Sequence, residues 1–342
     1  MTMITATRGP VPGDISNVPL RRTETGTPSC RTAFSRQSKT RWSDYASSNL
    51  IANSQEDPMM PQTRPSMTVV IPAHNEELGL ARLLPRLLTL ADPGEFRVIV
   101  VCNGCTDASA TEAGKHGPDV EVVTLPAPSK AAALAAGGAM VRDFPVAFVD
   151  ADVSLDARAL RALVRRVTLE GFLAAAPERH LVRDQVSLSA RWYYDIWERL
   201  PQVRSGLFGR GVIVLSESGY RRVAGMPHFI SDDLAYSEAF EAQERTIAVD
   251  STVSVWPART WRSLLQRRIR VVQGVQELGA AGRVSPSSST RPIDLLRIVA
   301  AAPSMALRLP LFLVTTALVR VRVRLGAPAK GVWLRDETSR IA

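Results

Sequence analysis

The sequence predicts an α/β protein in which a mostly parallel central sheet is flanked by helices, and two observations support this fold class. Short runs of β-branched and apolar residues alternate with helix-like segments at intervals of about 25 residues, which is the pattern of βαβ units. One such run, Val146–Val149, passes directly into Asp150-Ala151-Asp152. A buried parallel strand that ends in carboxylates is typical of the edge where α/β sheets bind ligands.

The alternation can be followed from residue 67 onward. Strands are expected at residues 67–72, 96–101, 120–125 and 146–149, and again at 171–176 and 206–214. Helices are expected from the leucines at 80–88, from Thr106, from Ser129 to Met140, from the apolar stripe at 159–167, and over 183–200.

Composition indicates a globular protein of 342 residues, 45% of them hydrophobic, with a formal net charge of +9. The arginines are scattered and do not alternate with aromatic residues along one stripe, so we expect no nucleic-acid partner. Phosphorylated substrates or anionic lipid account for the positive charge equally well. Three cysteines, Cys30, Cys102 and Cys105, cannot make a disulfide framework, which favours a cytoplasmic location.

Four segments are expected along the chain. Residues 1–65 are rich in Ser, Thr, Pro and Arg without apolar periodicity, which predicts a disordered leader. Its first five residues, MTMIT, resemble a β-galactosidase cloning-vector leader, so we interpret part of it as a fusion scar. A globular domain at 66–275, a polar linker at 276–292 and a helical C-terminal tail at 293–342 complete the expected organisation.

Polar residues follow the first three strands, and parallel strands end at the same edge of a sheet. Asn75 and Glu76 follow the first strand, Asn103 follows the second, and Lys130 begins the helix after the third. Amide and carboxylate groups bind base edges or ribose hydroxyls, and a lysine at a helix N-terminus binds phosphate, so together they predict a nucleotide pocket. Each also has a structural explanation, as a helix-opening pair, an Asx turn and a solvated lysine.

Two acidic segments are candidate sites of chemistry. Asp150 and Asp152 suit Mg²⁺ or Mn²⁺, because a hard cation commonly takes one or two carboxylates and completes its shell with substrate phosphates. The same pair also suits the cap of the helix that follows. Asp232 and Asp233 form the second acidic segment, which by itself also describes a helix N-terminus capped by Ser231.

In their order and spacing these motifs resemble the family 2 glycosyltransferases. The resemblance is carried by VVIPAHNEE (residues 69–77), VVCNGCTD (100–107), SKAAALAAG (129–137) and DAD (150–152). It covers about residues 67–275. The resemblance implies a GT-A fold, a nucleoside-diphosphate sugar donor that is UDP- or GDP-linked, a divalent cation and inversion at the anomeric carbon.

The resemblance also implies roles for individual residues. Those implied to bind the donor are Pro72, Ala73, Asn75, Glu76, Asn103 at the base, Lys130 near the pyrophosphate, and Asp150. Asp152 is implied to hold the metal together with Asp150, and Asp233 to act as the general base beside Asp232. Two positions depart from the family pattern: Asn103 stands where Asp is commoner, which leaves the base open, and Asp232 replaces the commoner Glu.

Residues 261–270 resemble a degenerate form of the Gln-X-X-Arg-Trp segment of processive members. Ile269 and Arg270 stand at the Arg and Trp positions, so polymer synthesis is not inferred. Gln266, Arg267 and Arg268 are expected to screen the leaving pyrophosphate, and the alternative is a basic helix face.

The tail carries an apolar stretch at residues 298–319 that contains Arg308 and is broken by two prolines. An arginine in the bilayer core costs about 2.5–3.5 kcal/mol, so we expect residues 293–325 to dock at a membrane interface and not to span it. Arg320, Arg322 and Arg324 suit anionic lipid at the inner face of the membrane. The alternative is a C-terminal helix packed on the catalytic domain.

The predicted function is a metal-dependent inverting glycosyltransferase that moves a sugar from a nucleoside-diphosphate donor to an acceptor hydroxyl or phosphate. The acceptor is left open between a lipid and a small molecule. Two alternatives remain, a catalytically silent sugar-nucleotide-binding protein and a nucleotidyltransferase on a related fold. The latter needs a Gly- and Arg-rich triphosphate loop near the first strand, and the sequence has PAHNE there.

Overall fold

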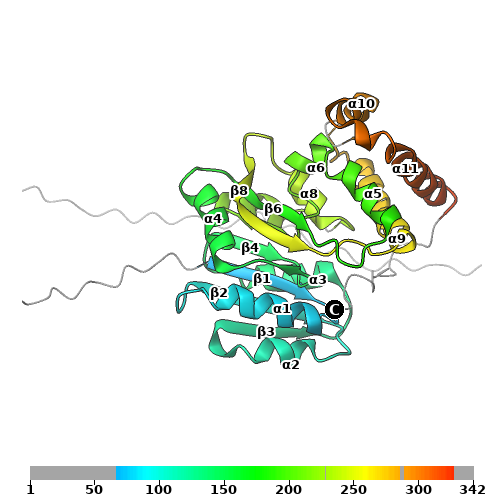
Figure 1. The fold of residues 1–342 in the computed structure, drawn as a ribbon. Coiled ribbons are helices and arrows are strands. Elements are labelled where there is room, and N and C mark those ends of the chain that lie inside the picture. Colours follow the sequence, from blue (N-terminus) through cyan, green and yellow to red (C-terminus); the bar gives the residue numbers. More distant parts are fainter. Residues whose placement is uncertain (1–66, 228, 286–288, 327–342) are drawn as a thin grey trace, which may run out of the picture. The chain divides into compact units, whose positions relative to one another are not determined.

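The structure is a computed structural model that describes residues 67–227, 229–285 and 289–326. Its centre is an eight-stranded sheet (Figure 1). Its strand order is β3-β2-β1-β4-β7-β6-β8-β5. In chain order the strands are β1 (Met67–Ala73), β2 (Phe96–Asn103), β3 (Val120–Leu125), β4 (Val146–Val149), β5 (Val153–Ser154), β6 (Ala174–Leu181), β7 (Val212–Leu215) and β8 (Arg245–Val255). The predicted leader lies outside the described residues.

The helices of the described residues follow the predicted alternation. They are α1 (Glu77–Leu88), α2 (Ser109–Gly114), α3 (Lys130–Ala139), α4 (Ala157–Thr168), α5 (Leu188–Trp197), α6 (Pro201–Ser205), α7 (Glu217–Ala224), α8 (Asp232–Glu238), α9 (Trp261–Ala280), α10 (Pro292–Ala301) and α11 (Leu309–Arg324). Ser129 caps α3 as its sequence position predicts, because its hydroxyl accepts a hydrogen bond from the Ala132 amide at 3.1 Å.

The sheet is mostly parallel, as predicted. Strands β3, β2, β1 and β4 are parallel neighbours, β7 runs antiparallel to β4 and β6, and β8 is parallel to β6. The strand expected at 206–214 is shorter than predicted, because Gly209 and Gly211 adopt φ angles of +65° and +67° that a strand does not contain. The strand expected at 171–176 begins at Ala174, and β8 and β5 have no counterpart in the prediction.

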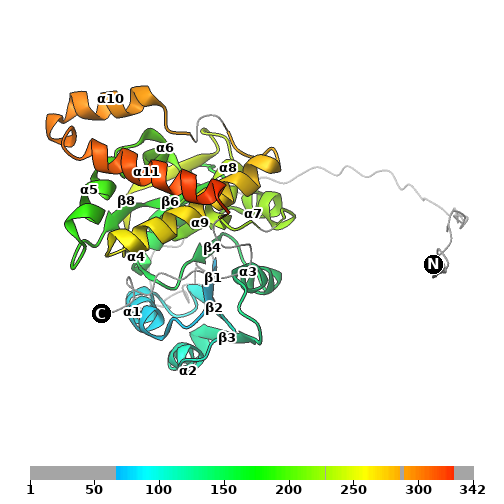
Figure 2. The ribbon, with the colours of Figure 1, turned by 90° about the vertical axis from the view of Figure 1, so that its right-hand side faces the viewer.

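Helices cover both faces of the parallel strands. Leu80, Leu83, Leu84 and Leu87 of α1 are fully buried against one face. The other face carries α3, which Figure 2 shows across β1 and β2 from α1. A Cβ atom at Gly137 would lie 2.4 Å from Val70 Cγ1, so only glycine allows α3 to approach the sheet this closely.

The C-terminal helices pack against earlier helices of the chain, and one predicted boundary falls inside a helix. The boundary at residue 275 falls inside α9, which continues to Ala280. Prolines divide the apolar stretch into α10 and α11, with Pro310 in the first turn of α11, where its missing N–H costs nothing. Helix α11 lies against α5 and α9 (Figure 2). Within the described ranges, no helix has the length and apolarity that a bilayer span requires.

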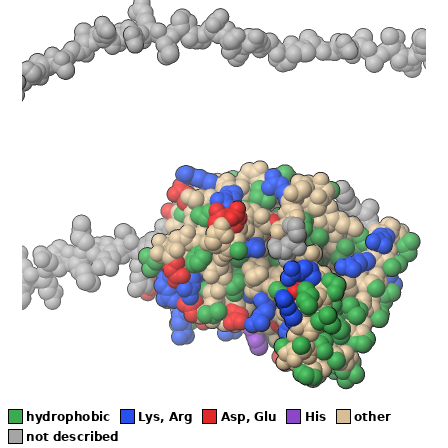
Figure 3. All heavy atoms as spheres, turned by 90° about the horizontal axis from the view of Figure 1, so that it is seen from above, with side chains coloured by type: hydrophobic (Ala, Val, Ile, Leu, Met, Phe, Trp, Pro, Cys, Tyr) green, Lys and Arg blue, Asp and Glu red, His purple; other side chains and the backbone are tan. Residues whose placement is uncertain are grey.

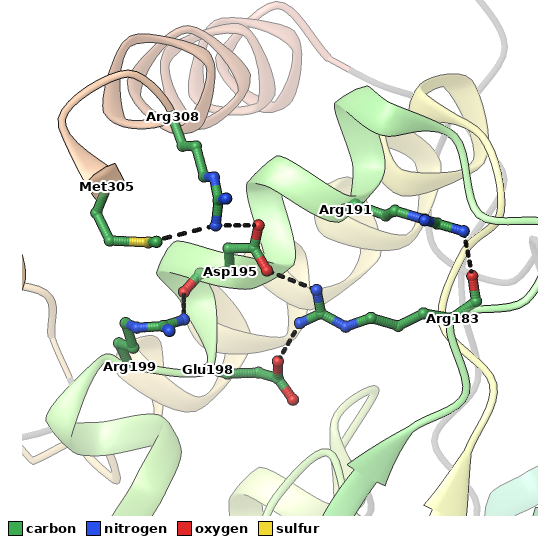
Figure 4. Close-up of polar contacts among 7 residues, drawn as sticks. All are labelled: Arg183, Arg191, Asp195, Glu198, Arg199, Met305 and Arg308. Atoms are coloured by element: carbon green, nitrogen blue, oxygen red, sulfur yellow. Dashed lines mark hydrogen bonds and ion pairs between the residues drawn. The ribbon is translucent and has the colours of Figure 1, made fainter. Parts of the chain in front are cut away.

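Helix α11 is fixed by an aromatic contact and by ions. The rings of Phe312 and Tyr193 stack with centroids 5.0 Å apart. Asp195, on α5, receives Arg308 Nη1 at 2.7 Å on one carboxylate oxygen and Arg183 Nη1 at 2.5 Å on the other (Figure 4). Arg183 also bonds Glu198. The arginine inside the apolar stretch is therefore neutralised by the protein body, and hydrophobic and cationic side chains share the remaining surface on this side (Figure 3).

Candidate active site

Asn103 ties together the ends of two strands and the beginning of a helix. Its side chain is 1% exposed at the end of β2. The amide donates to the Ala73 carbonyl of β1 at 2.7 Å and accepts from the Ser129 amide before α3 at 2.9 Å. Both polar ends of the side chain are thus used inside the protein. In this geometry Asn103 shapes the edge of the sheet, and its contact with a base stays a prediction.

The loops after β1 and β2 are bonded to each other. Asn75 adopts a φ of +48°. Its side-chain oxygen Oδ1 accepts from the Thr106 backbone amide at 2.6 Å, and its side-chain nitrogen Nδ2 donates to the Thr106 hydroxyl at 3.1 Å. The Glu76 amide donates to Ser109 Oγ at 2.7 Å. Pro72 and Ala73 are buried within β1. The loop that follows β1 is therefore held against the loop that follows β2, and the predicted contacts of Pro72, Ala73, Asn75 and Glu76 with a donor stay predictions.

Lys130 joins the two acidic segments. Its Nζ lies 2.7 Å from Asp150 Oδ1 and 3.1 Å from Asp232 Oδ2. Asp150 follows β4 and Asp232 opens α8, so residues about eighty positions apart in the chain meet at one ammonium. Asp156, and not Asp150 or Asp152, caps α4. Asp232 and Asp233 do lie in the first turn of α8, as the structural alternative expects, but the side chain of Ser231 does not cap that helix.

Burial and charge shift the pKa values of three groups around this junction. Burial alone would lower the pKa of Lys130, but the carboxylates of Asp150 and Asp232 raise it well above its ordinary value. Burial and the nearby charges of Asp233 and Asp150 raise the pKa of Asp232, against the opposing effect of Lys130. Burial and the Asp232 charge raise the pKa of Tyr236 to about 12. Lys130 and Tyr236 therefore remain protonated throughout the physiological range.

The loop 209–211, which the sequence analysis placed in a strand at 206–214, supports both acidic segments. The Gly209 amide donates to Asp233 Oδ2 at 2.7 Å, and the Gly211 carbonyl accepts from the Asp150 amide at 2.7 Å. Asp233 Oδ1 also accepts from the Leu234 amide at 2.8 Å. Arg210 is 3% exposed and donates only to backbone carbonyls, and burial lowers its pKa to about 9. The paired glycines around an arginine were the available signal.

Asp152 faces a group of arginines that lie on other elements. Its charge acts on Arg82 of α1 and on Arg270 of α9, and the Arg82 guanidinium sits 4.1 Å from the centroid of the Trp256 ring. Arg270 also feels the charges of Asp150 and Asp233, although burial and Arg267 lower its pKa. The charges of all three carboxylates therefore act on one arginine to which the sequence analysis had given no role.

The predicted basic residues of α9 do not all reach this region. Arg267 Nη1 donates to the Trp256 carbonyl at 3.4 Å, and its charge acts on Arg270, on which Asp152 also acts. Arg268 instead lies over Tyr193, 6.0 Å from the ring centroid, on the side of α9 that faces α5. Gln266 is exposed. We therefore retain Arg267, add Arg270, and leave Gln266 and Arg268 without a role in the structure.

A cavity of about 280 Å³ adjoins Asp232. Its wall is mainly apolar and aromatic, and its lining includes Leu134, Phe148, Tyr220, Met226, Asp232 and Tyr236. A carboxylate and two phenol groups in an otherwise apolar wall can orient a ligand that is itself partly apolar.

The carboxylates suit a divalent cation only in part. Within the described residues, no group of three or more His, Cys, Asp and Glu side chains could hold a metal ion by itself. Asp152 is partly exposed, and none of the described residues hydrogen-bonds its carboxylate, so its oxygens are available as ligands. One oxygen of Asp150 is engaged by Lys130. A cation that takes Asp152 and substrate phosphates fits this donor set.

Residues 68–222 match the model of the family described as Glycosyl transferase family 2. Two curated relatives, uncharacterized glycosyltransferases of Mycobacterium tuberculosis and Mycobacterium bovis, are each 39% identical over 99 residues, which are 29% of this chain and 42% of each relative. This segment is a family 2 glycosyltransferase domain. The chain spans less than half the length of the curated relatives that it matches.

One solved structure supports the fold. A mannosyltransferase from Pyrobaculum calidifontis, in complex with GDP-Man and Mn²⁺, has a TM-score of 0.53 at 20% identity, covering 79% of this chain and 78% of that one. The predicted GT-A fold is confirmed. The glycosyltransferase domain thus combines this fold with acidic segments that meet at Lys130.

Proposed function

We propose that the chain transfers a sugar from a nucleoside-diphosphate donor to an acceptor hydroxyl, with inversion at the anomeric carbon. The observation that carries the proposal is the meeting of Asp150 and Asp232 at the Lys130 ammonium, 2.7 and 3.1 Å away. It puts a cationic group for a leaving diphosphate next to the acidic segment that holds the base. The family match of residues 68–222 supports the same activity.

In this mechanism Asp233 accepts the proton of the acceptor hydroxyl as its oxygen attacks the anomeric carbon. The bond from that carbon to the diphosphate oxygen breaks at the same time. General base catalysis of this kind contributes about 10²–10⁴ in rate. The amides of Gly209 and Leu234, 2.7 and 2.8 Å from the Asp233 oxygens, orient the carboxylate. Lys130 and Arg270 stabilise the negative charge that develops on the leaving diphosphate.

Asp152, with the second oxygen of Asp150, would hold the divalent cation. When bound, Mg²⁺ or Mn²⁺ supplies positive charge that neutralises the departing diphosphate. The Mn²⁺ named in the complex of the P. calidifontis mannosyltransferase supports manganese as the first ion to test.

The donor is proposed to be UDP- or GDP-linked, and the acceptor to be a lipid or a small molecule. The GDP-Man named in the same complex supports a nucleoside-diphosphate donor. The cavity of about 280 Å³ beside Asp232 supports an acceptor that carries an apolar part, since most of its lining is apolar.

The test is an assay of free nucleoside diphosphate after the full chain is incubated with Mn²⁺ and a panel of UDP-, GDP- and dTDP-sugars. We expect Asp233→Asn to lower release by about 100-fold or more while the calorimetric donor affinity stays unchanged. Asp119→Asn, at an exposed acid far along the chain from the site, serves as the control.

Three other results would change the assignment. Near-normal release in Asp233→Asn would remove that residue from the base role. A donor that binds without release by the unmodified chain would identify a silent binding protein. Release of pyrophosphate from a nucleoside triphosphate would identify a nucleotidyltransferase.

A further inference from the structure

We propose that the outward face of α11 docks flat onto the surface of an anionic lipid bilayer. This outward face consists of Leu313, Val314, Ala317, Leu318 and Val321, together with Leu325 directly after the helix. The proposal concerns a surface that glycosyl transfer does not use, so it stands independently of the proposed function.

Helix α11 is apolar on both sides, although only one side is covered by protein. The inward side carries Phe312, Thr315 and Val319, which are 4%, 0% and 2% exposed against α5 and α9. On the outward face Val321 is 50% exposed and Leu325 is 81% exposed. A helix that is apolar on all sides is ordinarily buried on all sides, in a protein core or in a membrane. The composition of the outward face is therefore that of a surface that contacts another apolar phase.

Arginines border this face on both sides. At 3.6 residues per turn, Arg320 and Arg324 lie along one flank of the outward face and Arg322 lies along the other. All three side chains are exposed. An apolar stripe with cationic residues at both flanks is the arrangement of helices that lie in a membrane interface, because a long arginine side chain reaches the headgroups while its stem stays in the apolar layer.

The segment that precedes α11 also exposes apolar residues and carries positive charge. Leu296 on α10 is 64% exposed and Leu307, before α11, is 70% exposed. In Figure 3, hydrophobic side chains gather beside Lys and Arg side chains on the side of the molecule that α10 and α11 occupy. Residues 295–326 contain five arginines and no Asp or Glu, and one of the five, Arg308, is already neutralised by Asp195.

Charge complementarity favours anionic lipid over a second copy of the chain. In a two-fold symmetric dimer each outward face would meet another that carries three arginines and no carboxylate, so no ion pair could form between the faces. An anionic bilayer pairs with all three arginines. Each arginine near such a surface strengthens binding by about fivefold, so three together contribute about 100-fold.

The experiment uses the full chain and vesicles, with sedimentation as the readout. We expect binding to vesicles of phosphatidylcholine plus phosphatidylglycerol and at least about tenfold weaker binding to phosphatidylcholine alone. The combined Leu318→Glu and Val321→Glu variant should lose binding. The matched control places glutamates at two other exposed apolar residues, Leu169 and Val249, which are 78% and 75% exposed and lie away from α11.

A second variant separates charge from apolar burial. The combined Arg320→Gln, Arg322→Gln and Arg324→Gln variant should bind anionic vesicles about 100-fold more weakly, and added salt should reproduce much of this loss. Its control is the combined Arg86→Gln, Arg142→Gln and Arg158→Gln variant, which removes the same charge from exposed positions elsewhere. Unchanged thermal unfolding in the variants shows that the fold is intact.

Three outcomes would overturn the proposal. The first is a full chain that binds neither kind of vesicle. The second is equal loss of binding in the outward-face variants and their controls. The third is a dimer in analytical ultracentrifugation that the Leu318→Glu and Val321→Glu changes dissociate, because the outward face would then be covered by a second copy. None of these outcomes alters the donor assay, so failure here leaves the transfer activity untouched.

Discussion

The ammonium of Lys130 lies 2.7 Å from the carboxylate of Asp150, at the carboxyl end of β4. The same ammonium lies 3.1 Å from the carboxylate of Asp232, so one side chain pairs with a carboxylate that follows β4 and with one that begins α8. Because these carboxylates raise the pKa of Lys130 well above its ordinary value, the charge is present at every physiological pH. The junction of the two acidic segments therefore depends on one side chain.

Replacing Lys130 by Gln should lower kcat/KM for sugar transfer by about 100-fold. The substitution removes the cation beside the leaving diphosphate and leaves Asp150 and Asp232 to repel each other. Lys115→Gln is the matched control, because Lys115 is exposed and pairs only with Glu112 on its own helix turn. Steady-state release of nucleoside diphosphate measures both variants, and equal rates in the two would show that Lys130 has no part in transfer.

Replacing Asn103 should cost stability, and the choice of replacement separates its two hydrogen bonds. Asn103→Ala removes the partners of the Ala73 carbonyl and the Ser129 amide, which should lower the free energy of unfolding by about 2 kcal/mol. Asn103→Asp can still accept from Ser129 but cannot donate to Ala73, so we expect it to be destabilised as well. Urea denaturation measures both. An aspartate variant as stable as the unmodified chain would show that the donated bond contributes nothing.

Gly211→Ala should be more damaging than the same change at another glycine with positive φ. Gly211 and Gly94 have φ angles of +67° and +72°, so alanine costs about 1–2 kcal/mol of backbone strain at each. At Gly211 the added Cβ would also lie 2.4 Å from Val153 Cγ1 and 3.3 Å from Asp150, whereas at Gly94 it meets nothing within 4 Å. We therefore expect a larger loss of unfolding free energy and a loss of activity only in Gly211→Ala. Equal effects would contradict this account.

The acid stability of the tail should depend on Asp294. This carboxylate accepts from the Arg291 amide at 3.0 Å, and that hydrogen bond lowers its pKa below the ordinary value. Its stabilisation is therefore complete above the unfolded-state pKa of about 3.9 and is lost as pH falls through the lower folded-state pKa. The difference in unfolding free energy between the unmodified chain and Asp294→Asn should be constant near neutral pH and shrink on acidification. A difference that grows with acid would have the wrong sign.

The parallel half of the fold could be predicted because each of its strands is a short run rich in β-branched and apolar residues. The strands expected at 67–72, 96–101, 120–125 and 146–149 each lie within two residues of β1, β2, β3 and β4. Nearly all residues of β1, β2 and β4 are buried, which produces mostly apolar runs. Strand β3 lies at the edge of the sheet and carries the exposed Glu121 and Thr124, but its valines still indicate a strand. Strand β8 was missed because polar residues interrupt it, as in Asp250-Ser251-Thr252, and its partners β6 and β5 come from distant parts of the chain.

The acidic residues and Lys130 were also recognisable in the sequence, since the order of motifs points to them. Arg82 and Arg270 were not. Each sits on an amphipathic helix, where an arginine ordinarily indicates a solvated face. The charge of Asp152 acts on Arg82 and Arg270 only because the tertiary fold brings α1 and α9 near it. No short stretch of the sequence indicates this proximity. For the same reason the sequence could not show that Arg268 lies over Tyr193 of α5.

The loop 209–211 connects Asp233, the proposed proton acceptor, to Asp150, which is proposed to lie beside the leaving group. Gly209 holds Asp233, Gly211 holds the Asp150 backbone, and the buried Arg210 between them is anchored to surrounding carbonyls. An inserted residue can lengthen a chain by up to about 3.6 Å, which exceeds the length of any hydrogen bond in the loop. We therefore expect homologous chains to vary in the sequence around this tripeptide more readily than in its length, because a change of length would alter the path that the transferred sugar must travel.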